Sequence, residues 1–403
     1  MKVLYIDGVG PFGGASRSLY EAVKALPPGE VQPHFLAVRG TALDYYRQIA
    51  TDIVSTRGIT RFDNTLYSHY RGLRWLILLR EAGYVPFSVE ALIRAKQRWG
   101  AIDVIHANEV LELFVAIAAK RLFSAPLVVH VRSVQNANAR SNRYHIICNL
   151  LRRFADKVIA IDENVRASLP ADIDVSIIHN SFTPKAAAVP DVSMIQKLEA
   201  LPPDSLKVGF VGNLHHSKGL FEMQGAARIM AETGRQVDFV IVGGTTISDE
   251  GSGAAALSRS GLAQNVRQEL SKRAQALGIS NRFHLMGPTN DIQNVYNRID
   301  VICFASHFNA PGRPIFEAAF AGVPSIAAIT NPLPDTIVPY ETGVAVAPKD
   351  DKGLATAIAH FADNRGEVAR MGENARRLAN ANFDPVKNSV ALLELYKTAT
   401  SND

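Results

Sequence analysis

The stretch NAPGRPIFEAAFAGVPSIAA, residues 309–328, contains a loop, a helix and a strand in one continuous run. Its Pro-Gly pair opens the loop, its small residues favour a helix that packs closely on a sheet, and Gly322-Val323-Pro324 ends that helix before the apolar strand. One carboxylate, Glu317, lies in the first turns of the helix. The helix dipole alone favours an acidic residue there. A nucleotide explains it better, because helix N–H groups bind phosphate and a carboxylate accepts hydrogen bonds from ribose hydroxyls.

The same alternation of strand and helix runs through the whole chain in two series. The predicted strands are residues 2–6, 33–38, 104–106, 127–131, 157–161 and 175–178 in the first series, and 207–211, 237–242, 283–286, 301–304 and 325–328 in the second. Helical patterns separate them, at residues 16–25, 89–99, 110–122 and 144–154 of the first series. Such alternation is typical of parallel sheets covered by helices on both faces. The sequence therefore predicts an α/β fold with two doubly wound sheets, whose ligands bind at the carboxyl ends of the strands.

The length of the chain also favours two domains, since 403 residues exceed what one hydrophobic core usually holds. Prolines cluster within residues 183–203, which marks this segment as the junction. We predict a first domain at 1–185 and a second at 186–383. Residues 384–403 are predicted to form a terminal helix that packs back towards the first domain.

The composition excludes several classes of protein. With 47% apolar and 20% charged residues, the chain has the composition of a globular protein. Its two cysteines, Cys148 and Cys303, are too few for a disulfide framework and indicate a reducing compartment. The first apolar run is too short for a signal peptide, and no uncharged run reaches the roughly 18 residues of a spanning helix. These features favour a cytoplasmic protein.

The positive charge is concentrated in the first half of the chain. Residues 1–185 hold 23 Lys and Arg against 16 Asp and Glu, a balance of +7, so the remaining 20 and 22 give −2. Residues 61–98 mix arginines with aromatic and aliphatic side chains. This mixture suits docking on an anionic membrane surface, at the inner face of the plasma membrane, and equally suits an ordinary pair of surface helices. We expect no nucleic acid, because no recognised nucleic-acid-binding fold accompanies the charge.

A glycine-rich loop follows the first predicted strand. Residues 8–13, GVGPFG, match the dinucleotide fingerprint GxGxxG. However, Pro11 removes one N–H from the turn, and Arg39 follows the next strand where an acidic residue would bind ribose. NAD binding is therefore a weak alternative, and a tight structural turn is another. We favour a loop in which Gly13 and Gly14 bring the backbone close to a ligand in a cleft between the domains.

A second loop, GNLHHSKG at residues 212–219, follows the first strand of the second series. The ammonium group of Lys218 can neutralise a diphosphate as a point charge, although a solvated surface lysine is the competing interpretation. His215 and His216 lack an apparent third metal ligand, so we interpret them as loop residues. The Asp172-Ile173-Asp174 sequence matches a metal-binding DxD motif, but a solvated turn accounts for it better.

Several segments follow one another along essentially the whole chain: GGASRSL (13–19), DVIHAN (103–108), FADKVIAIDENV (154–165), IIHNS (177–181), VGNLHHSKGL (211–220), FVIVGG (239–244), FHLMGPT (283–289), YNRIDVICFAS (296–306) and residues 309–328. In this order they resemble the GT-B glycosyltransferases of family 4, which are retaining enzymes that use nucleotide sugars. The last of these segments resembles the most specific family motif, E-x-F-G-x-x-x-x-E-A-x-A-x-G-x-P. The resemblance implies two Rossmann-like domains that face each other across a cleft.

The resemblance also implies roles for individual residues. Glu317 would hold the ribose hydroxyls, and Lys218 would neutralise the diphosphate. The other residues implied in donor binding are Gly13 and Gly14 near the sugar phosphate, Asn213 in the lysine loop, Gly287 and Pro288 beside the base, and Gly312, Arg313, Pro314 and Ile315, whose backbone would offer N–H groups to phosphate or sugar.

Three positions depart from the family pattern. Asn309 stands where the family has the first Glu of its pair, and Asn213 stands where it has an Arg. The family's catalytic-site His falls near Arg132, but His130 lies two residues earlier on the same strand and so shares its face. We therefore predict that the catalytic residues come from Arg132, His130, Asn309 and Lys218.

The resemblance implies transfer of a hexose-type sugar from a UDP or GDP donor, with retention, to a hydroxyl of a glycan or lipid-linked acceptor, in the synthesis of cell-surface polysaccharide or glycoconjugate. Cationic and backbone donors stabilise the departing diphosphate in such a reaction, so we expect no metal and no other cofactor. The acceptor is expected on the first domain. The alternatives are a non-catalytic sugar-nucleotide-binding protein on the same scaffold, a sugar-nucleotide epimerase and the NAD-dependent oxidoreductase.

Overall fold

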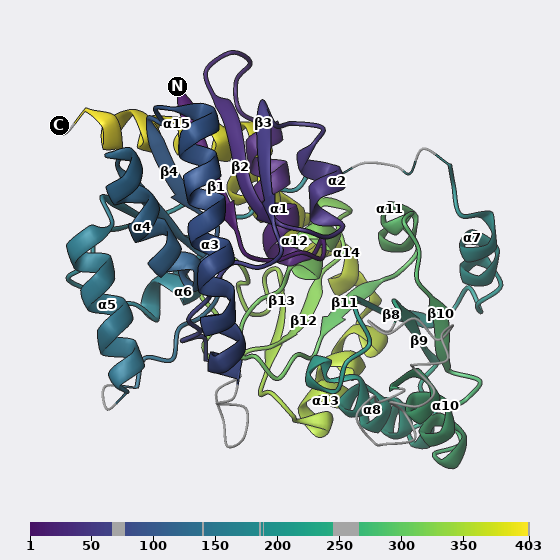
Figure 1. Ribbon diagram of the computed structural model, residues 1–403. Coiled ribbons are helices and arrows are strands. Elements are labelled where there is room, and N and C mark those ends of the chain that lie inside the picture. The colour runs from purple at the N-terminus through teal and green to yellow at the C-terminus, as the bar shows by residue number, and fades with distance from the viewer. Residues whose placement is uncertain (67–76, 139–140, 185–186, 188, 245–265, 402–403) are drawn as a thin grey trace. The chain divides into compact units, whose positions relative to one another are not determined.

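The computed structural model describes residues 1–66, 77–138, 141–184, 187, 189–244 and 266–401. The chain forms two compact units (Figure 1), one of Met1–Thr183 with Asn382–Asp403 and one of Pro184–Ala381. The sequence placed the boundary after residue 185, and the contacts place it after Thr183. Each unit has one parallel sheet with helices on both faces, as the alternation of strands and helices predicted.

The first unit contains a seven-stranded sheet of order β3-β2-β1-β4-β5-β6-β7. Every neighbouring pair is parallel. The strands are β1 Lys2–Asp7, β2 Gln32–Val38, β3 Asp52–Thr56, β4 Val104–Ala107, β5 Leu127–Val131, β6 Lys157–Ala160 and β7 Val175–Ile177. The helices are α1 Gly14–Lys24, α2 Ala42–Tyr46, α3 Ile77–Trp99, η2 Val110–Glu112, α4 Leu113–Phe123, α5 Asn142–Phe154, α6 Glu163–Ala167 and α15 Pro385–Thr400.

Successive residues of β1 enter two different hydrophobic cores. Val3 and Tyr5 pack with residues of α1, α2 and α15, whereas Leu4 and Ile6 pack with residues of α3, α4 and α5. This division follows from the strand period of two, which sends neighbouring side chains to opposite faces. Both faces of the sheet are therefore buried, and β1 is apolar along almost its whole length, as buried parallel strands usually are.

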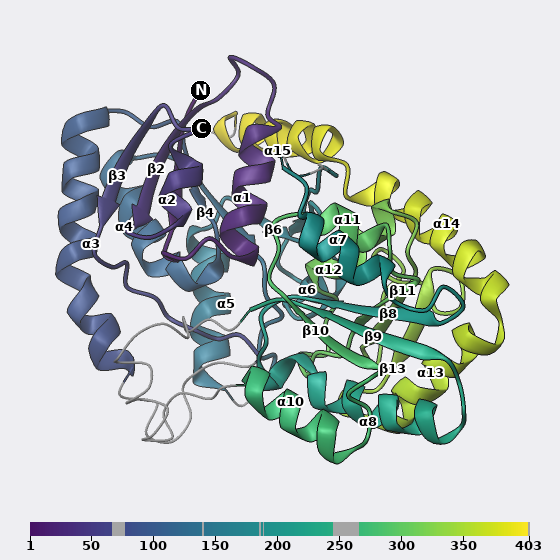
Figure 2. The same ribbon diagram turned by 90° about the vertical axis from the view of Figure 1, so that its right-hand side faces the viewer.

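The terminal helix α15 belongs to the first unit and lies beside α1 (Figure 2). Leu392 and Tyr396 are buried in the core formed on the α1 face of the sheet. The hydroxyl of Tyr396 lies 2.7 Å from Nδ1 of His106 in β4. Ser389 donates a hydrogen bond to the carbonyl of Ala25 just after α1 (2.8 Å). The last residues of the chain thus complete the core that the first strand begins.

The second unit contains a six-stranded parallel sheet of order β10-β9-β8-β11-β12-β13. The strands are β8 Leu206–Val211, β9 Val237–Val242, β10 Phe283–Gly287, β11 Val301–Phe304, β12 Ser325–Ala328 and β13 Gly343–Val346. The helices are α7 Val192–Glu199, η3 His216–Lys218, α8 Leu220–Glu232, α10 Val266–Ala276, α11 Ile292–Tyr296, α12 Arg313–Phe320, α13 Asp351–Asp363 and α14 Arg365–Asn382. Helices α8, α10 and α13 cover one face, and α7, α11 and α12 cover the other.

Two edge strands, the short helices α2 and α6, and part of one long helix were missing from the sequence prediction. The strands β3 and β13 lie at sheet edges, where one side of a strand meets water and the apolar pattern is weaker. Helix α3 was predicted from residue 89, after Pro86, because proline usually ends a helix. The structure continues this helix back to Ile77, with Pro86 on its exposed side.

In both sheets the order of the strands reverses beside the first strand of the unit. The chain runs from β1 outwards to β3 and then returns to the other side of β1 as β4; it does the same from β8 to β10 and back to β11. A crevice forms outside the carboxyl ends of the strands at such a reversal, and ligands of doubly wound sheets bind there. The two reversals therefore identify the loops after β1 and β4, and those after β8 and β11, as the places to examine.

Candidate functional site

Lys218 lies at the strand-order reversal of the second unit, in the short helix η3 that follows β8. Its Nζ is 5.6 Å from the ring centre of Phe304 and 5.2 Å from that of Phe308, both of which come from the end of β11. The N–H of His307 donates to the carbonyl of Ser217 (2.9 Å), which ties the two loops together. Burial lowers the pKa of Lys218, while the aromatic faces stabilise its ammonium group.

The ring of Phe304 also contacts the start of α12, so one side chain connects Lys218 with that helix. A Cβ atom at Gly312 would lie 2.2 Å from the ring of Phe304. The backbone of Gly312 is extended, with φ −118°, so glycine is required there by the close approach of the ring and not by its dihedral angles. The structure therefore brings Lys218 and the amino terminus of α12 to the same end of the sheet.

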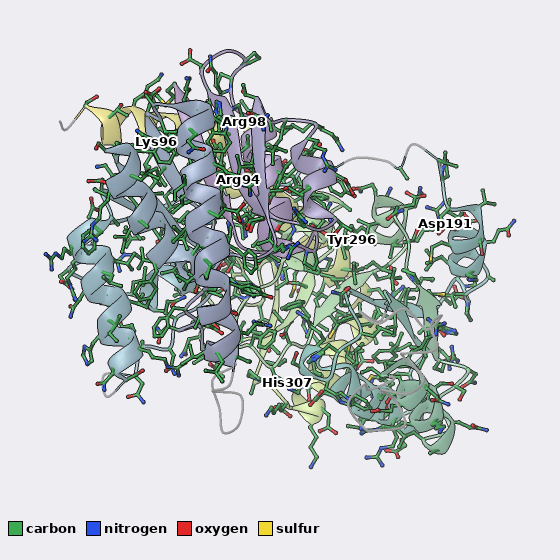
Figure 3. The ribbon with its side chains drawn as sticks, viewed as in Figure 1. Arg94, Lys96, Arg98, Asp191, Tyr296 and His307 are labelled. Carbon is green, nitrogen blue, oxygen red and sulfur yellow. The ribbon has the colours of Figure 1, made fainter. Side chains whose placement is uncertain are left out.

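Glu317 lies in the second turn of α12 and is buried. Its Oε1 accepts a hydrogen bond from Nε of Arg313 (3.0 Å), and its Oε2 accepts one from the hydroxyl of Tyr296 (2.9 Å). Tyr296 is labelled in Figure 3. These contacts fix the orientation of the carboxylate at the end of the sheet where a nucleotide would bind. They also mean that a ribose would share this carboxylate with Arg313 and Tyr296.

Two of the four backbone donors predicted at the start of α12 do not fit that role. Pro314 has no N–H group, and the N–H of Ile315 donates to the carbonyl of Gly312 (3.0 Å). The prediction of N–H donors is thus reduced to Gly312 and Arg313. The sequence already showed that Pro314 lacks an N–H group, but it could not show that the first turn uses the amide of Ile315 internally.

The remaining predicted donor residues of this unit lie in the loops at the same sheet end. Gly287 ends β10, and its carbonyl accepts the N–H of Gly243 (3.0 Å), while Pro288 follows it and is exposed. Asn213 is exposed after β8. Asn309 has a left-handed backbone, with φ 48°, and its Oδ1 accepts hydrogen bonds from the backbone N–H (2.8 Å) and hydroxyl (3.1 Å) of Thr330. Asn309 thus stabilises the loop after β12. This structural role explains the asparagine without any contact to a sugar.

Arg132 is the centre of a hydrogen-bond network at the strand-order reversal of the first unit. It follows β5, and its Nε donates to the carbonyl (3.0 Å) and Oδ1 (2.8 Å) of Asn108, just after β4. Nη1 donates to Oδ1 of Asn180 (2.7 Å), which follows β7. Nη2 contacts Nδ1 of His130 (3.1 Å). One guanidinium group thus joins the ends of β4, β5 and β7, and His130 and Arg132 do lie on the same face of β5.

The contact with Arg132 defines the protonation state of His130. A guanidinium group only donates hydrogen bonds, so Nδ1 of His130 is the acceptor and the ring proton lies on Nε2. Burial, followed by the charge of Arg132, lowers the pKa of His130 well below its usual range. His130 is therefore neutral and 3% exposed, whereas Arg132 is 9% exposed at the end of the strand. Of the two predicted candidates, Arg132 lies closer to the surface.

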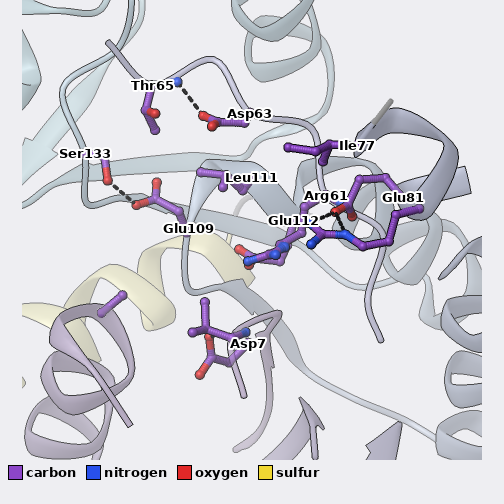
Figure 4. Close-up of a pocket in the computed structure, with 13 residues that line it drawn as sticks. Asp7, Arg61, Asp63, Thr65, Ile77, Glu81, Glu109, Leu111, Glu112 and Ser133 are labelled. Carbon is purple, nitrogen blue, oxygen red and sulfur yellow. Dashed lines mark hydrogen bonds and ion pairs between the residues drawn. The ribbon is translucent and has the colours of Figure 1, made fainter. Parts of the chain in front are cut away.

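A cavity of about 460 Å³ opens at the same reversal of the first unit. The sequence analysis did not predict the residues that line it: Asp7, Val9, Ala15, Arg61, Asp63, Thr65, Ile77, Arg80, Glu81, Glu109, Leu111, Glu112 and Ser133. Figure 4 shows Glu109 beside Ser133 and Glu112 beside Arg61, with Asp7 below them. One signal was available, because Asp7 ends β1 and Glu109 comes two residues after β4. Acidic residues at the carboxyl ends of adjacent parallel strands are expected to meet.

Glu109 is bound on both of its oxygens. Oε1 accepts the N–H groups of Val110 (2.9 Å) and Arg132 (3.2 Å), and Oε2 accepts the hydroxyl of Ser133 (2.9 Å). Burial nevertheless raises the pKa of Glu109 to about 7, because these hydrogen bonds and the charge of Arg132 offset only part of the desolvation. Near neutral pH this carboxyl group is thus close to half ionised.

The glycine-rich loop does not bind as a dinucleotide fingerprint would. The N–H of Gly8 donates to Oε1 of Glu112 (3.2 Å) and that of Val9 donates to Oδ1 of Asp7 (3.3 Å), so carboxyl groups occupy amides that a pyrophosphate would need. Gly13 and Gly14 are exposed, neither has a positive φ, and an added Cβ at Gly14 would meet nothing within 4 Å. A tight turn therefore does not explain these two glycines.

The sequence features considered as metal sites have other partners. Asp172 of the DxD sequence forms an ion pair with Arg152 on the surface (2.7 Å). Nδ1 of His215 lies 2.8 Å from the hydroxyl of Ser217, and His216 stacks on Phe221. Over the described ranges of the chain, no three His, Cys, Asp or Glu side chains are grouped so as to hold a metal ion.

Two family models match the chain. "Glycosyltransferase Family 4" matches residues 12–184 and "Glycosyl transferases group 1" matches residues 193–378, so the first covers nearly all of the first sheet and the second covers the second unit. Among similar curated proteins, a glycogen synthase of Mycobacterium tuberculosis is 24% identical over 313 residues, covering 74% of this chain and 69% of that protein. A D-inositol 3-phosphate glycosyltransferase of Corynebacterium diphtheriae is 25% identical over 395 residues, covering 91% of this chain and 88% of that protein.

Solved structures share the fold of both units. The crystal structure of Anabaena Alr3699/HepE in complex with UDP has a TM-score of 0.75 and 21% identity, covering 99% of this chain and 100% of that one. Sucrose-phosphate synthase from Thermosynechococcus elongatus has a TM-score of 0.70 and 19% identity, with complete coverage of both chains. The two doubly wound sheets therefore form the GT-B fold that the sequence predicted.

The raised pKa of Glu109 leads to a pH-dependent prediction. The folded protein holds the Glu109 proton up to a pH of about 7, whereas an unfolded chain releases it near about 4.3. The stability that this protonation contributes is complete below the unfolded pKa and is lost as the pH rises through the folded value. Glu109→Gln mimics the protonated side chain, so we expect this variant to become more stable relative to wild type between pH 5 and pH 8.

Urea unfolding of both proteins at several pH values measures this difference. Glu90→Gln, an exposed residue of α3, is the matched control and should differ from wild type by the same amount at each pH. A difference between Glu109→Gln and wild type that does not change with pH would contradict the assignment.

Proposed function

This chain belongs to the group 1 glycosyltransferases of family 4, and we propose that it transfers a hexose-type sugar from UDP to a hydroxyl group of a glycan or lipid-linked acceptor, with retention at the anomeric carbon. The observation that carries the proposal is the arrangement at the β8–β11 reversal, where Phe304 lies between Lys218 and the start of α12. A cation and a helix amino terminus at one end of a doubly wound sheet suit a nucleoside diphosphate.

The structural neighbours support UDP over GDP as the donor nucleotide. Crystal structures of Alr3699/HepE contain UDP, UDP with glucose, and UDP-glucose. Their identity to this chain is only 21–22%, so they establish the shared fold and make UDP the first nucleotide to test. Family membership gives no support to the NAD-dependent oxidoreductase, and carboxyl groups bind two of the amides in the glycine-rich loop.

The chemistry assigned to the donor site follows from the charge that develops during transfer. As the anomeric C–O bond breaks, negative charge accumulates on the departing diphosphate, and an oxocarbenium-like sugar forms beside it. The ammonium group of Lys218 and the amino terminus of α12 stabilise that charge, and they need no rearrangement to do so because they are already oriented. The departing phosphate then takes the proton of the acceptor hydroxyl as the new glycosidic bond forms.

Arg313 and Tyr296 position the carboxylate of Glu317 for the ribose of the donor. A buried carboxylate with two fixed partners loses little orientational freedom when a ligand binds. The loop after β10, with Gly287 and Pro288, is assigned to the base, and Asn213 is assigned to the phosphate side of the pocket. Asn309 and Arg132 remain candidates for contact with the transferred sugar, in addition to the structural hydrogen bonds that each makes.

The outer face of α3 supports docking on an anionic membrane. Leu79 (70% exposed), Val85, Val89 and Ile93 are exposed apolar residues of this helix. Arg94, Lys96 and Arg98, labelled in Figure 3, belong to the same helix. Arg94 pairs with Glu90 (3.3 Å) and Arg98 with Asp52 (2.5 Å), so part of their charge is already balanced. An amphipathic surface of this kind binds lipid through apolar contact plus attraction to anionic headgroups. Of the aromatic residues noted within residues 61–98, those at 67–76 lie outside the described residues, and no helix in the described part of the chain could span a bilayer.

Calorimetry with UDP, GDP and ADP tests the donor site. We expect UDP to bind most tightly, and we expect Lys218→Ala to weaken its binding about 10- to 100-fold, the value of a charge-assisted hydrogen bond to phosphate. Glu317→Gln should also weaken UDP binding, because a carboxamide accepts ribose hydrogen bonds less strongly than a carboxylate. Lys352→Ala, an exposed lysine of α13, should bind UDP as wild type does. Unchanged affinity in both site variants would contradict the assignment.

The proposal that Lys218 and helix α12 replace a metal ion gives a second prediction. Release of UDP from UDP-glucose, which also distinguishes turnover from binding alone, should proceed at the same rate with and without EDTA. The control is Lys218→Ala assayed with added Mg²⁺, which should remain slow if the metal has no place at the site. Loss of activity in EDTA that Mg²⁺ restores would show that the leaving group needs a metal.

The membrane proposal is tested by co-sedimentation with vesicles. Wild type should bind vesicles that contain phosphatidylglycerol, less at high salt because the headgroup attraction is screened, and it should bind neutral phosphatidylcholine vesicles weakly. Val89→Asp with Ile93→Asp should abolish binding. Val192→Asp, an exposed valine of α7 (60% exposed), is the matched control and should bind normally. Equal binding to both vesicle types would rule out an anionic docking surface.

A further inference from the structure

The cavity of the first unit lies where a doubly wound sheet binds ligands, and its side chains have an unusual charge for an enzyme of nucleotide sugars. Five lining residues carry carboxyl groups and two carry guanidinium groups: Asp7, Asp63, Glu81, Glu109 and Glu112 against Arg61 and Arg80. Arg80 is paired with Glu81 (2.6 Å). The excess of carboxyl groups contrasts with the net charge of +7 that residues 1–185 carry as a whole.

One side chain in this cavity has a polar atom with no hydrogen-bond partner among the described residues. Glu112 is 1% exposed, and its Oε1 accepts the N–H of Gly8 (3.2 Å). Its Oε2 is buried and makes no hydrogen bond with the described residues. Leaving such an atom unpaired costs free energy, so a ligand that pairs with it would be stabilised. Glu112 lines the cavity (Figure 4), so a molecule that fills the cavity lies next to this side chain.

The protonation of Glu112 determines which partner suits it. Burial, followed by the nearby carboxyl groups of Asp7 and Glu109, raises the pKa of Glu112 well above its usual range. The protonated side chain carries its proton on Oε2, since Oε1 accepts from Gly8. Glu112 therefore presents an O–H donor. In the same cavity, Glu109 presents carboxyl oxygens and Ser133 presents a hydroxyl oxygen. A ligand with several hydroxyl groups can both accept and donate in this arrangement.

The other lining residues give the cavity an apolar side. Val9, Ala15, Ile77 and Leu111 contribute aliphatic groups to its wall. A volume of about 460 Å³ lies within the range of small-ligand pockets. A sugar or cyclitol ring has a C–H face for such a wall and hydroxyl groups around its edge for the carboxyl groups. A phosphate group would instead meet more carboxyl than guanidinium groups, and one of the two guanidinium groups, that of Arg80, is already paired with Glu81. The cavity therefore offers an anion little net attraction.

We propose that this cavity binds the acceptor as an uncharged, hydroxyl-rich ring, with Glu112 donating a hydrogen bond to it, and that the cavity excludes phosphate-bearing rings. This inference rests on the proposed glycosyltransferase activity and names the chemical class of its acceptor. A lipid-linked acceptor would keep its phosphates outside the cavity and place only its terminal sugar inside. The basic surface of the first unit and its acidic cavity would then recognise different parts of one acceptor.

Saturation-transfer NMR on the full chain tests the inference. The probes are the methyl glycosides of glucose, galactose, mannose and N-acetylglucosamine, together with the 6-phosphates of the three hexoses. We expect transfer to at least one neutral glycoside and to none of the phosphates. Glu112→Ala should abolish the signal, whereas Glu112→Gln should retain it because the carboxamide N–H₂ takes the place of the O–H. Glu90→Ala removes an exposed carboxylate of α3 (59% side-chain exposure) and should leave the signal unchanged.

Ala15→Leu provides a second variant that fills the cavity without changing its charge, and it should also abolish the signal. Stronger transfer to the phosphates, no transfer to any neutral glycoside, or a signal that survives both Glu112→Ala and Ala15→Leu would overturn the inference. UDP calorimetry on the same variants keeps this result separate from the donor proposal, because Lys218 and Glu317 belong to the second unit. Normal UDP binding with no glycoside binding would reject the acceptor class alone, and the reverse pattern would reject the donor site alone.

Discussion

The reversal of strand order beside β1 and beside β8 is the constraint on which both candidate sites depend. Parallel strands need crossover connections, and these are almost always right-handed, so a chain that winds outwards in one direction must return to the first strand before it can cover the other half of the sheet. The loops on either side of the first strand then point away from each other and leave a crevice. Asp7 and Glu109 line the cavity at one such crevice, and Lys218 and Gly312 lie against the ring of Phe304 at the other.

The two reversals have the same strand topology but opposite electrostatics. In the second unit a lysine and a helix amino terminus create a positive electrostatic potential, and two aromatic rings limit the hydration of the lysine. In the first unit buried carboxyl groups dominate, and Arg132 joins the ends of β4, β5 and β7 by hydrogen bonds to Asn108, His130 and Asn180. A glycosyltransferase has reason to separate these potentials, because its donor is an anion and its acceptor need not be one.

Much of the fold was predictable because its signal is local. Most buried strands are continuous apolar runs, and the prediction missed β3 and β13, edge strands with a weaker pattern. The candidate donor residues were also found from sequence, since the lysine loop and residues 309–328 each lie in one short segment. By contrast, the acidic cavity is lined by residues from separate segments of the chain, such as Asp7, Arg61, Glu109 and Ser133. No single segment contains enough of these residues to form a motif.

The sequence by itself determined the α/β architecture, the two-domain organisation, the family and the short motifs, because each depends on periodicity or on residues close together in the chain. Only the tertiary structure decided how those motifs are used. It showed that the N–H of Ile315 is used within the first turn of α12 and that Asn309 accepts hydrogen bonds from Thr330. It also showed that Arg313 and Tyr296 orient Glu317, and that Nδ1 of His130 is unprotonated because it faces Arg132. The physical reason is that the hydrogen-bond partners, the burial and the pKa of a side chain depend on its neighbours in space, and many of these neighbours are far away in the sequence. Folding brings them together at the carboxyl ends of two parallel sheets.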